Sequence, residues 1–137
     1  MVDTKLEHDE FAREISKIMG KLNPSINKNE FEYYDRRRKY LINPPKINLL
    51  VQVHSTIIIF ECKVKRKFMG KSKQLDFHYK NINKKKLEFL QYGRLNNFDK
   101  ILKMYAVKKS NKMINTETNE KFKFDPDFIN NPLIILK

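Results

Sequence analysis

The sequence predicts an α/β protein in which helices flank a central mixed β-sheet. Three features favour this class: an amphipathic segment near the start, two β-rich segments around a short turn in the middle, and a helix followed by another strand. The chain of 137 residues has no internal repeat and no linker rich in Ser or Gly. We therefore expect one domain that spans residues 1–137.

The first expected element is an amphipathic helix. Its apolar residues recur at helical spacing, at Phe11, Ile15, Ile18, Met19 and Leu22. Asp3 or Thr4 would cap this helix, and Asn23-Pro24 would end it. The charged and aromatic segment 27–40 that follows is compatible with more than one structure and stays unassigned.

A β-hairpin is expected at the centre of the sheet. Residues 47–53 and 56–64 are rich in β-branched and aliphatic side chains, and His54-Ser55 forms the turn between them. The two strands are therefore expected to pair across this turn.

The next expected elements are a loop, a short extended piece and a helix. Residues 65–73 form the basic loop, and residues 75–79 form the extended piece. Asn81 or Asn83 would cap the helix. The apolar positions of this helix are Leu87, Leu90 and Leu95.

The last expected element is a strand over residues 101–108. The tail beyond it contains an alternating stretch at 121–124 and an apolar stretch at 133–136. Either the apolar stretch or the last strand of the core is a candidate dimer interface.

The charge of the chain indicates a polyanionic partner. Lys and Arg number 29 against 16 Asp and Glu, which leaves a formal net charge of +13. Because each neutralised phosphate releases condensed counterions, nucleic acid is the leading partner and an anionic membrane the weaker one. A solvated, lysine-rich surface is the alternative interpretation of the same composition.

Other classes of protein find no support in the sequence. The longest apolar run, 56–60, is much shorter than the about 20 residues that cross a bilayer, and the acidic start is unlike a signal peptide. Cys62 is the single cysteine, which excludes an internal disulfide and a zinc site of several thiolates. No Gly-rich phosphate loop or Ser-His-acid arrangement is visible. We expect an intracellular, cytoplasmic protein without a membrane partner.

Candidate chemistry lies on the hairpin. Because strand side chains alternate between faces, Glu61 and Lys63 point the same way, and Asn48 is the expected cross-strand partner of Glu61. Two oxygen-donor side chains can bind Mg²⁺, while a lysine orients or deprotonates the water that attacks a phosphodiester. The backbone carbonyl of Cys62 would add a ligand. The competing interpretation is a strand that runs out into solvent with ordinary surface charges.

Two stretches of the hairpin match a known pattern: Lys46-Ile47-Asn48-Leu49-Leu50 and Phe60-Glu61-Cys62-Lys63-Val64. This arrangement resembles the signature of PD-(D/E)XK nucleases, and more closely that of archaeal and viral Holliday-junction resolvases. The resemblance covers roughly residues 1–110.

The resemblance implies a restriction-endonuclease-like core and Mg²⁺-dependent or Mn²⁺-dependent cleavage of branched DNA, in the context of DNA recombination and repair. It also implies a homodimer, because a four-way junction presents two symmetric cleavage sites. An excess of Ile, Lys and Asn is typical of AT-rich genomes, and the compact size is compatible with a viral or archaeal protein.

One position departs from the family pattern, because Asn48 stands where these nucleases have a metal-binding Asp. An amide oxygen can ligate a cation but brings no charge, so metal affinity and turnover should fall steeply. Three explanations compete: a deliberate Asp-to-Asn change that disables the enzyme, a natural domain that binds without cutting, or a different strand register. The first is favoured, because the residues around position 48 fit the pattern and Asn is nearly isosteric with Asp.

The resemblance further implies a glutamate on the first helix that completes the metal site. Glu10 is the first choice, and Glu14, one turn later on the same flank, is the alternative. Either acid alone is equally well explained as a solvated surface residue. The predicted catalytic residues are Glu10, Asn48, Glu61 and Lys63, and the predicted metal ligands are Glu10, Asn48, Glu61 and Cys62.

Basic residues beside the hairpin are expected to bind the phosphates of the substrate. They are Arg36, Arg37, Arg38, Lys65, Arg66, Lys67, Lys71, Lys73, Lys84, Lys85 and Lys86. The last three are expected in the first turn of a helix, where the helix dipole disfavours cations, so phosphates explain them better. A solvated, charged helix face is the alternative for the first three.

Three functions therefore compete. The first is a resolvase-type endonuclease whose activity Asn48 disables. The second is a related PD-(D/E)XK nuclease that acts on other DNA or on RNA. The third is a non-catalytic, basic nucleic-acid-binding domain in which Asn48 is native.

Overall fold

The computed structural model describes residues 4–32, 46–65, 73–84, 86–93, 95–109 and 112–123. The elements are α1 (Thr4–Gly20), β1 (Ile26–Glu32), β2 (Lys46–Val53), β3 (Thr56–Lys63), α2 (Lys73–Lys84), α3 (Lys86–Gly93), β4 (Lys100–Val107), β5 (Lys112–Asn115) and β6 (Lys121–Lys123). The strands form one six-stranded sheet in sequential order. Because β3 and β4 are parallel while the other neighbours are antiparallel, the predicted mixed sheet is confirmed.

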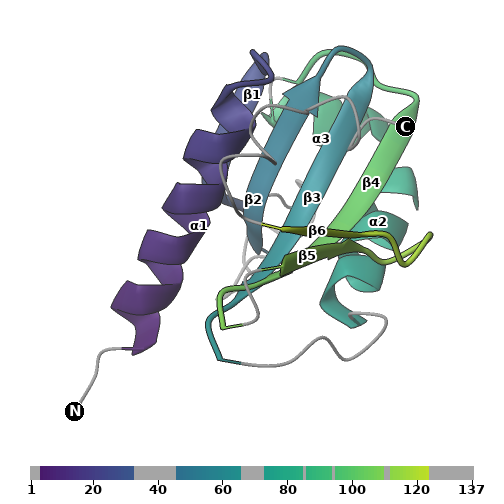
Figure 1. Ribbon diagram of the computed structural model, residues 1–137. Helices are drawn as coiled ribbons and strands as arrows, with labels where there is room; N and C mark the ends of the chain where they lie inside the picture. The colour runs from purple at the N-terminus through teal and green to yellow at the C-terminus, as the bar shows by residue number, and fades with distance from the viewer. Residues whose placement is uncertain are drawn as a thin grey trace.

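Helices cover both faces of the sheet (Figure 1). On one face α1 packs through the buried side chains of Phe11, Ile15 and Met19, as its apolar spacing predicts. On the other face α2 and α3 pack through Leu75 and Phe89. The predicted class, an α/β protein with helices flanking a central sheet, is therefore confirmed.

The central hairpin is present at the predicted place and in the predicted register. Leu49 is the partner of Phe60, and Val53 is the partner of Thr56. The turn residue His54 has a φ of 54°, a left-handed backbone conformation that closes the tight turn. Layers on both sides of the sheet explain why β3 is apolar without alternation, since its residues from Ile57 to Phe60 are all fully buried.

The crossover from β3 to β4 differs from the prediction. Residues 75–79, expected to be extended, belong to α2, and Asn81 and Asn83 lie inside that helix instead of capping the next one. The spacing of Leu75, His78 and Ile82 places all three on one buried helical face, and burial against the sheet outweighs the preference of Asn for a cap.

The other strands of the sheet are β1, β4, β5 and β6, and three of them correspond to segments discussed from the sequence. The expected strand at 101–108 is confirmed as β4, and part of the unassigned segment 27–40 forms β1. The alternating stretch at 121–124 supplies β6, while the apolar stretch at 133–136 lies outside the described residues. Among the described residues no helix combines the length and the apolar character needed to span a bilayer.

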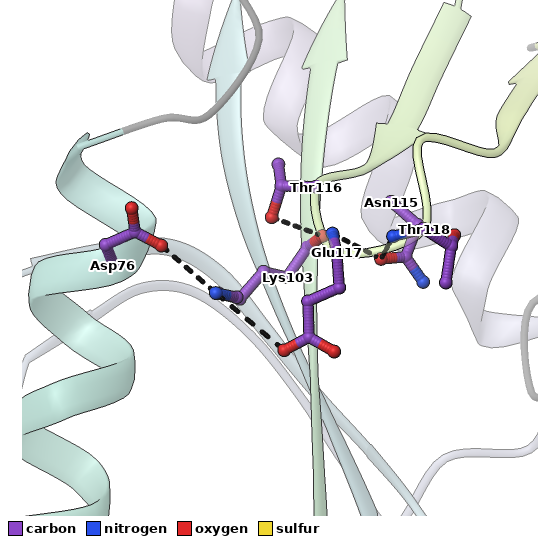
Figure 2. A network of polar contacts seen from close by, with 6 residues as sticks. All are labelled: Asp76, Lys103, Asn115, Thr116, Glu117 and Thr118. Atoms are coloured by element: carbon purple, nitrogen blue, oxygen red, sulfur yellow. Dashed lines mark hydrogen bonds and ion pairs between the residues drawn. The ribbon is translucent and has the colours of Figure 1, made fainter.

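A polar network joins α2, β4 and the turn after β5 (Figure 2). The Lys103 ammonium on β4 lies 3.0 Å from Asp76 Oδ1 on α2 and 3.7 Å from Glu117 Oε1. The same ammonium stands 4.7 Å from the centre of the Tyr79 ring. Because both carboxylates are partly exposed, each pair contributes modestly to stability, but together they fix α2 across β4.

His78 makes the stability of the fold sensitive to acid. Burial on the inner face of α2 lowers the pKa of His78 to about 4, although a hydrogen bond with the backbone of Lys46 acts in the opposite direction. Between the ordinary pKa of 6.5 and about 4, the unfolded chain binds a proton that the folded chain does not. The stability contribution of neutral His78 is therefore complete above pH 6.5 and decreases as the pH falls toward 4.

We expect the free energy of unfolding to fall by about 2 kcal/mol between pH 7 and pH 4.5 because of this one side chain. Urea titrations at the two pH values would measure the loss. His78→Gln should remove most of the difference, because Gln keeps polar atoms but does not titrate. An equal loss in the wild-type chain and the variant would assign the acid sensitivity to other groups.

Candidate functional site

Asn48 lies where β2 stops pairing with β3. Leu49 and Phe60 are the last Cα partners at this end of the hairpin. One step further, Asn48 Oδ1 accepts a hydrogen bond of 2.8 Å from the backbone N–H of Cys62. In a regular antiparallel ladder that N–H would be bonded to the main chain of β2. The predicted cross-strand pairing of Asn48 with Glu61 is therefore absent from the register, and the Asn48 side chain takes the place of a main-chain bond to Cys62.

Near Asn48, the side chains of β1 and β2 change the side of the sheet on which they lie. This change explains the orientation of the Asn48 amide. Leu49 packs on the α1 side of the sheet, whereas Ile47 packs on the α2 side, although strict alternation would place both on the same side. Glu30, the neighbouring position on β1, has a φ of 49°, and Phe31 beyond it packs with Ile47. Asn48 therefore sits at a local irregularity, which allows its amide to turn sideways toward β3.

Glu61 and Lys63 share one face of β3, as predicted. Glu61 Oε1 lies 3.2 Å from Lys63 Nζ, with 9% of the Glu61 side chain and 34% of the Lys63 side chain exposed. Glu61 is the one buried acid among the described residues whose side-chain burial is given. Because burying a carboxylate is costly unless it is paired, its position at a strand end marks a candidate site.

Cys62 contributes its backbone to this site and its thiol to the core. The side chain is fully buried on the α1 side, and burial, reinforced by the Glu61 charge and opposed by Lys63, raises the pKa of the thiol far above its usual range. The thiol is therefore unsuited to bind a metal. Since N–H and C=O of one strand residue point to the same side, the carbonyl faces the gap beside Asn48.

The two candidate glutamates of α1 differ in their contacts. Glu10 is exposed, and no hydrogen bond or ion pair joins it to another described residue. Glu14 Oε1 lies 4.0 Å from Lys108 Nζ, and the backbone N–H of Lys108 donates to the carbonyl of Lys63 at 2.9 Å. This contact extends Glu14 toward the end of β3 and favours the alternative over the first choice.

Glu61 faces α2, whereas α1 lies on the opposite side of the sheet. The helix-borne acids and Glu61 therefore approach the strand end from different sides. Within the described ranges, no three His, Cys, Asp or Glu side chains lie closely enough together to hold a metal ion, as this separation would suggest.

Four of the predicted phosphate-binding residues are described. Lys65 is exposed directly after β3, and Lys73 is exposed at the start of α2. Lys84 and Lys86 do not share a first helical turn as expected, since Lys84 ends α2 and Lys86 begins α3. The others lie outside the described residues: Arg36, Arg37, Arg38, Arg66, Lys67, Lys71 and Lys85.

Lys86 makes an internal contact. Its ammonium donates a hydrogen bond to the carbonyl of Phe98 and stands 4.7 Å from the centre of the Phe98 ring. The next residue, Asp99, donates its N–H to Ser55 in the hairpin turn. This turn is at the opposite end of β3 from Glu61, so Lys86 is remote from the candidate site.

Three lysines near the site were not selected from the sequence. Backbone N–H groups of Lys108 and Lys109 donate to the carbonyls of Lys63 and Val64, each at 2.9 Å, and Lys112 is the β5 partner of Val107. Only the parallel register of β3 and β4 brings these lysines together with Lys63. No local sequence pattern indicates that register.

Comparison with known proteins adds no assignment to this geometry. No protein-family model matches the chain, and no significant match was found among curated proteins. The interpretation of the site therefore depends on the residues described above.

Proposed function

We propose that this chain is a metal-dependent DNA endonuclease domain of the PD-(D/E)XK type that acts on four-way junctions as a homodimer, and that Asn48 disables hydrolysis. The observation that carries the proposal is a buried acid, Glu61, paired with Lys63 beside the gap in strand pairing that Asn48 fills. The order of a first helix, the strand β1, a hairpin, a helical crossover and a further strand supports the proposal, because the family resemblance implies a helix, a hairpin, a helix and a strand in this order.

The oxygen atoms at the candidate site are the kind of ligand that a hard divalent cation prefers, but together they carry little negative charge. The Glu61 carboxylate, the Asn48 amide oxygen and the Cys62 carbonyl would be the ligands of Mg²⁺ or Mn²⁺, which prefer oxygen. Such a cation supplies a Lewis acid and an activated water. Glu61 alone brings a negative charge, and Asn48 Oδ1 is already engaged with the Cys62 N–H. Metal affinity should therefore be weak in this chain.

An aspartate at position 48 would supply the negative charge that this set of ligands lacks. One carboxylate oxygen could keep the hydrogen bond with Cys62, while the other oxygen would remain available and add a second negative charge. Lys63 would stay beside Glu61, 3.2 Å from its carboxylate, where its ammonium offers a positive charge to a phosphate.

A second function is favoured by one observation. The Asn48 amide has a structural role of its own, because it satisfies a backbone N–H that strand pairing leaves open. A native Asn48 with this role, in a chain of net charge +13, fits a non-catalytic nucleic-acid-binding domain. In that case the Glu61–Lys63 pair stabilises the strand end.

The experiment that separates the two functions is a Mg²⁺-dependent cleavage assay on a labelled four-way junction and a matched linear duplex. The chain with Asn48 and its Asn48→Asp variant are compared side by side. We expect the variant to cut the junction in paired strands at least about a hundredfold faster than the Asn48 chain, since metal charge stabilisation amounts to several kcal/mol. Preferential cleavage of the linear duplex by the variant would indicate a related nuclease. Binding without cleavage by both proteins would support the second function.

A further inference from the structure

We infer that the ends of β3 and β4 form a docking surface for a nucleic-acid backbone, built from Lys65, Lys108, Lys109 and Lys112. We call these four residues the β3–β4 rim. The inference uses the proposed function only to take nucleic acid as the partner. It requires neither a metal nor cleavage.

Chain topology places the rim beside the candidate site. The parallel pairing puts the carboxyl ends of β3 and β4 at the same edge, and the N–H groups of Lys108 and Lys109 are bonded to the carbonyls of Lys63 and Val64. In open α/β sheets, ligands bind outside the carboxyl ends of parallel strands. The rim occupies this location.

The strand pairing places one rim lysine, Lys112, on the same face of the sheet as the candidate site. Lys63 is the partner of Val107 on β4, and Val107 is the partner of Lys112 on β5. Because direct partners on neighbouring strands point to the same side, Lys112 shares the face of Glu61 and Lys63. Two strand spacings separate the backbones of Lys63 and Lys112, which is about 10 Å. Duplex DNA carries one charge per about 1.7 Å of its axis, so several phosphates face a row of this length.

The charges of the rim are poorly neutralised within the chain. Lys108 has a partner at 4.0 Å, Glu14, and both side chains are largely exposed. Lys65 and Lys109 are exposed, and no ion pair links Lys65, Lys109 or Lys112 to another described residue. Clustered like charges repel, and a polyanion removes that repulsion with release of counterions. Lys63 and Lys112 lie in a row along the sheet edge, on the face of Glu61. A row of charges matches the line of phosphates in a nucleic acid better than a flat lipid surface.

The test compares two doubly substituted chains that lose the same charge. Lys109→Gln/Lys112→Gln changes the rim, whereas Lys17→Gln/Lys21→Gln removes two exposed lysines, one in the last turn of α1 and one directly after it. Binding to a labelled duplex and to a four-way junction is measured by fluorescence anisotropy in EDTA at several salt concentrations. Thermal melts check that both variants stay folded.

We expect the rim variant to bind about tenfold more weakly and to lower the salt slope by about 2, with the α1 variant within about twofold of wild type. Equal losses in the two variants would show diffuse binding and overturn the inference. A loss of binding to phosphatidylserine vesicles with unchanged DNA binding would overturn it as well. EDTA prevents metal-dependent cleavage, so this experiment measures binding alone. The docking surface is wrong if the binding test fails, and the nuclease proposal is wrong if the separate cleavage assay fails.

Discussion

Glu61→Gln, introduced into the Asn48→Asp chain, should lower Mg²⁺-dependent junction cleavage at least about a thousandfold. The substitution removes the one buried carboxylate of the site and leaves Lys63 without its partner at 3.2 Å. A metal ion contributes several kcal/mol of charge stabilisation, and about 4 kcal/mol corresponds to a thousandfold change in rate. Initial rates on a labelled junction would measure the loss.

Two controls make this result specific. Glu120→Gln removes the same charge from an exposed position before β6 and should leave the rate within about twofold. Junction affinity in EDTA should be retained by Glu61→Gln, because the substitution removes no positive charge. Cleavage that persists in the Glu61→Gln chain would sink the proposed catalytic role, and Lys63→Met would then show whether the lysine matters alone.

Phe60→Ala is expected to cost about 3–5 kcal/mol of folding free energy, the largest stability effect among single substitutions near the site. Phe60 is fully buried on the α1 side, next to Glu61 and packed in the same cluster as Phe11 and Ile15. Truncation leaves a cavity between α1 and the sheet, and domains of this size are stable by only about 5–15 kcal/mol.

Urea denaturation followed by circular dichroism would measure this cost. Leu87→Ala is the matched control, because that side chain is 76% exposed and its loss should change stability by less than about 0.5 kcal/mol. Phe60→Leu should lose less than Phe60→Ala, since it fills most of the cavity. Similar losses for Phe60→Ala and Leu87→Ala would mean that α1 is not held by this core.

The hairpin could be predicted because its information is local. A continuous apolar run on β3, a short turn and a matching strand determine the register, and Leu49 faces Phe60 as expected. The shared face of Glu61 and Lys63 follows from the same alternation. The sideways turn of Asn48 does not, because it depends on the positive φ of Glu30 on another strand.

The misassigned crossover has a different physical origin. In α2 only Leu75, His78 and Ile82 are buried, and the polar residues between them gave a weak helical signal. The neighbouring Asn residues matched a cap preference that tertiary packing overrides. Three rim lysines, Lys108, Lys109 and Lys112, were missed for a third reason, since the pairing of β3 with β4 across two helices leaves no trace in local sequence.

The parallel β3–β4 pairing has a consequence for the order in which the chain is made. Thr56 pairs with Lys100, so β3 leaves the ribosome well before the strand that covers its outer edge. At about 5–20 residues per second this delay is roughly 2 to 9 seconds. During that interval the run Ile57-Ile58-Ile59-Phe60 is an open, apolar sheet edge of the kind that pairs with other chains. A nascent or truncated chain that ends before β4 is therefore the form of this protein most prone to aggregate.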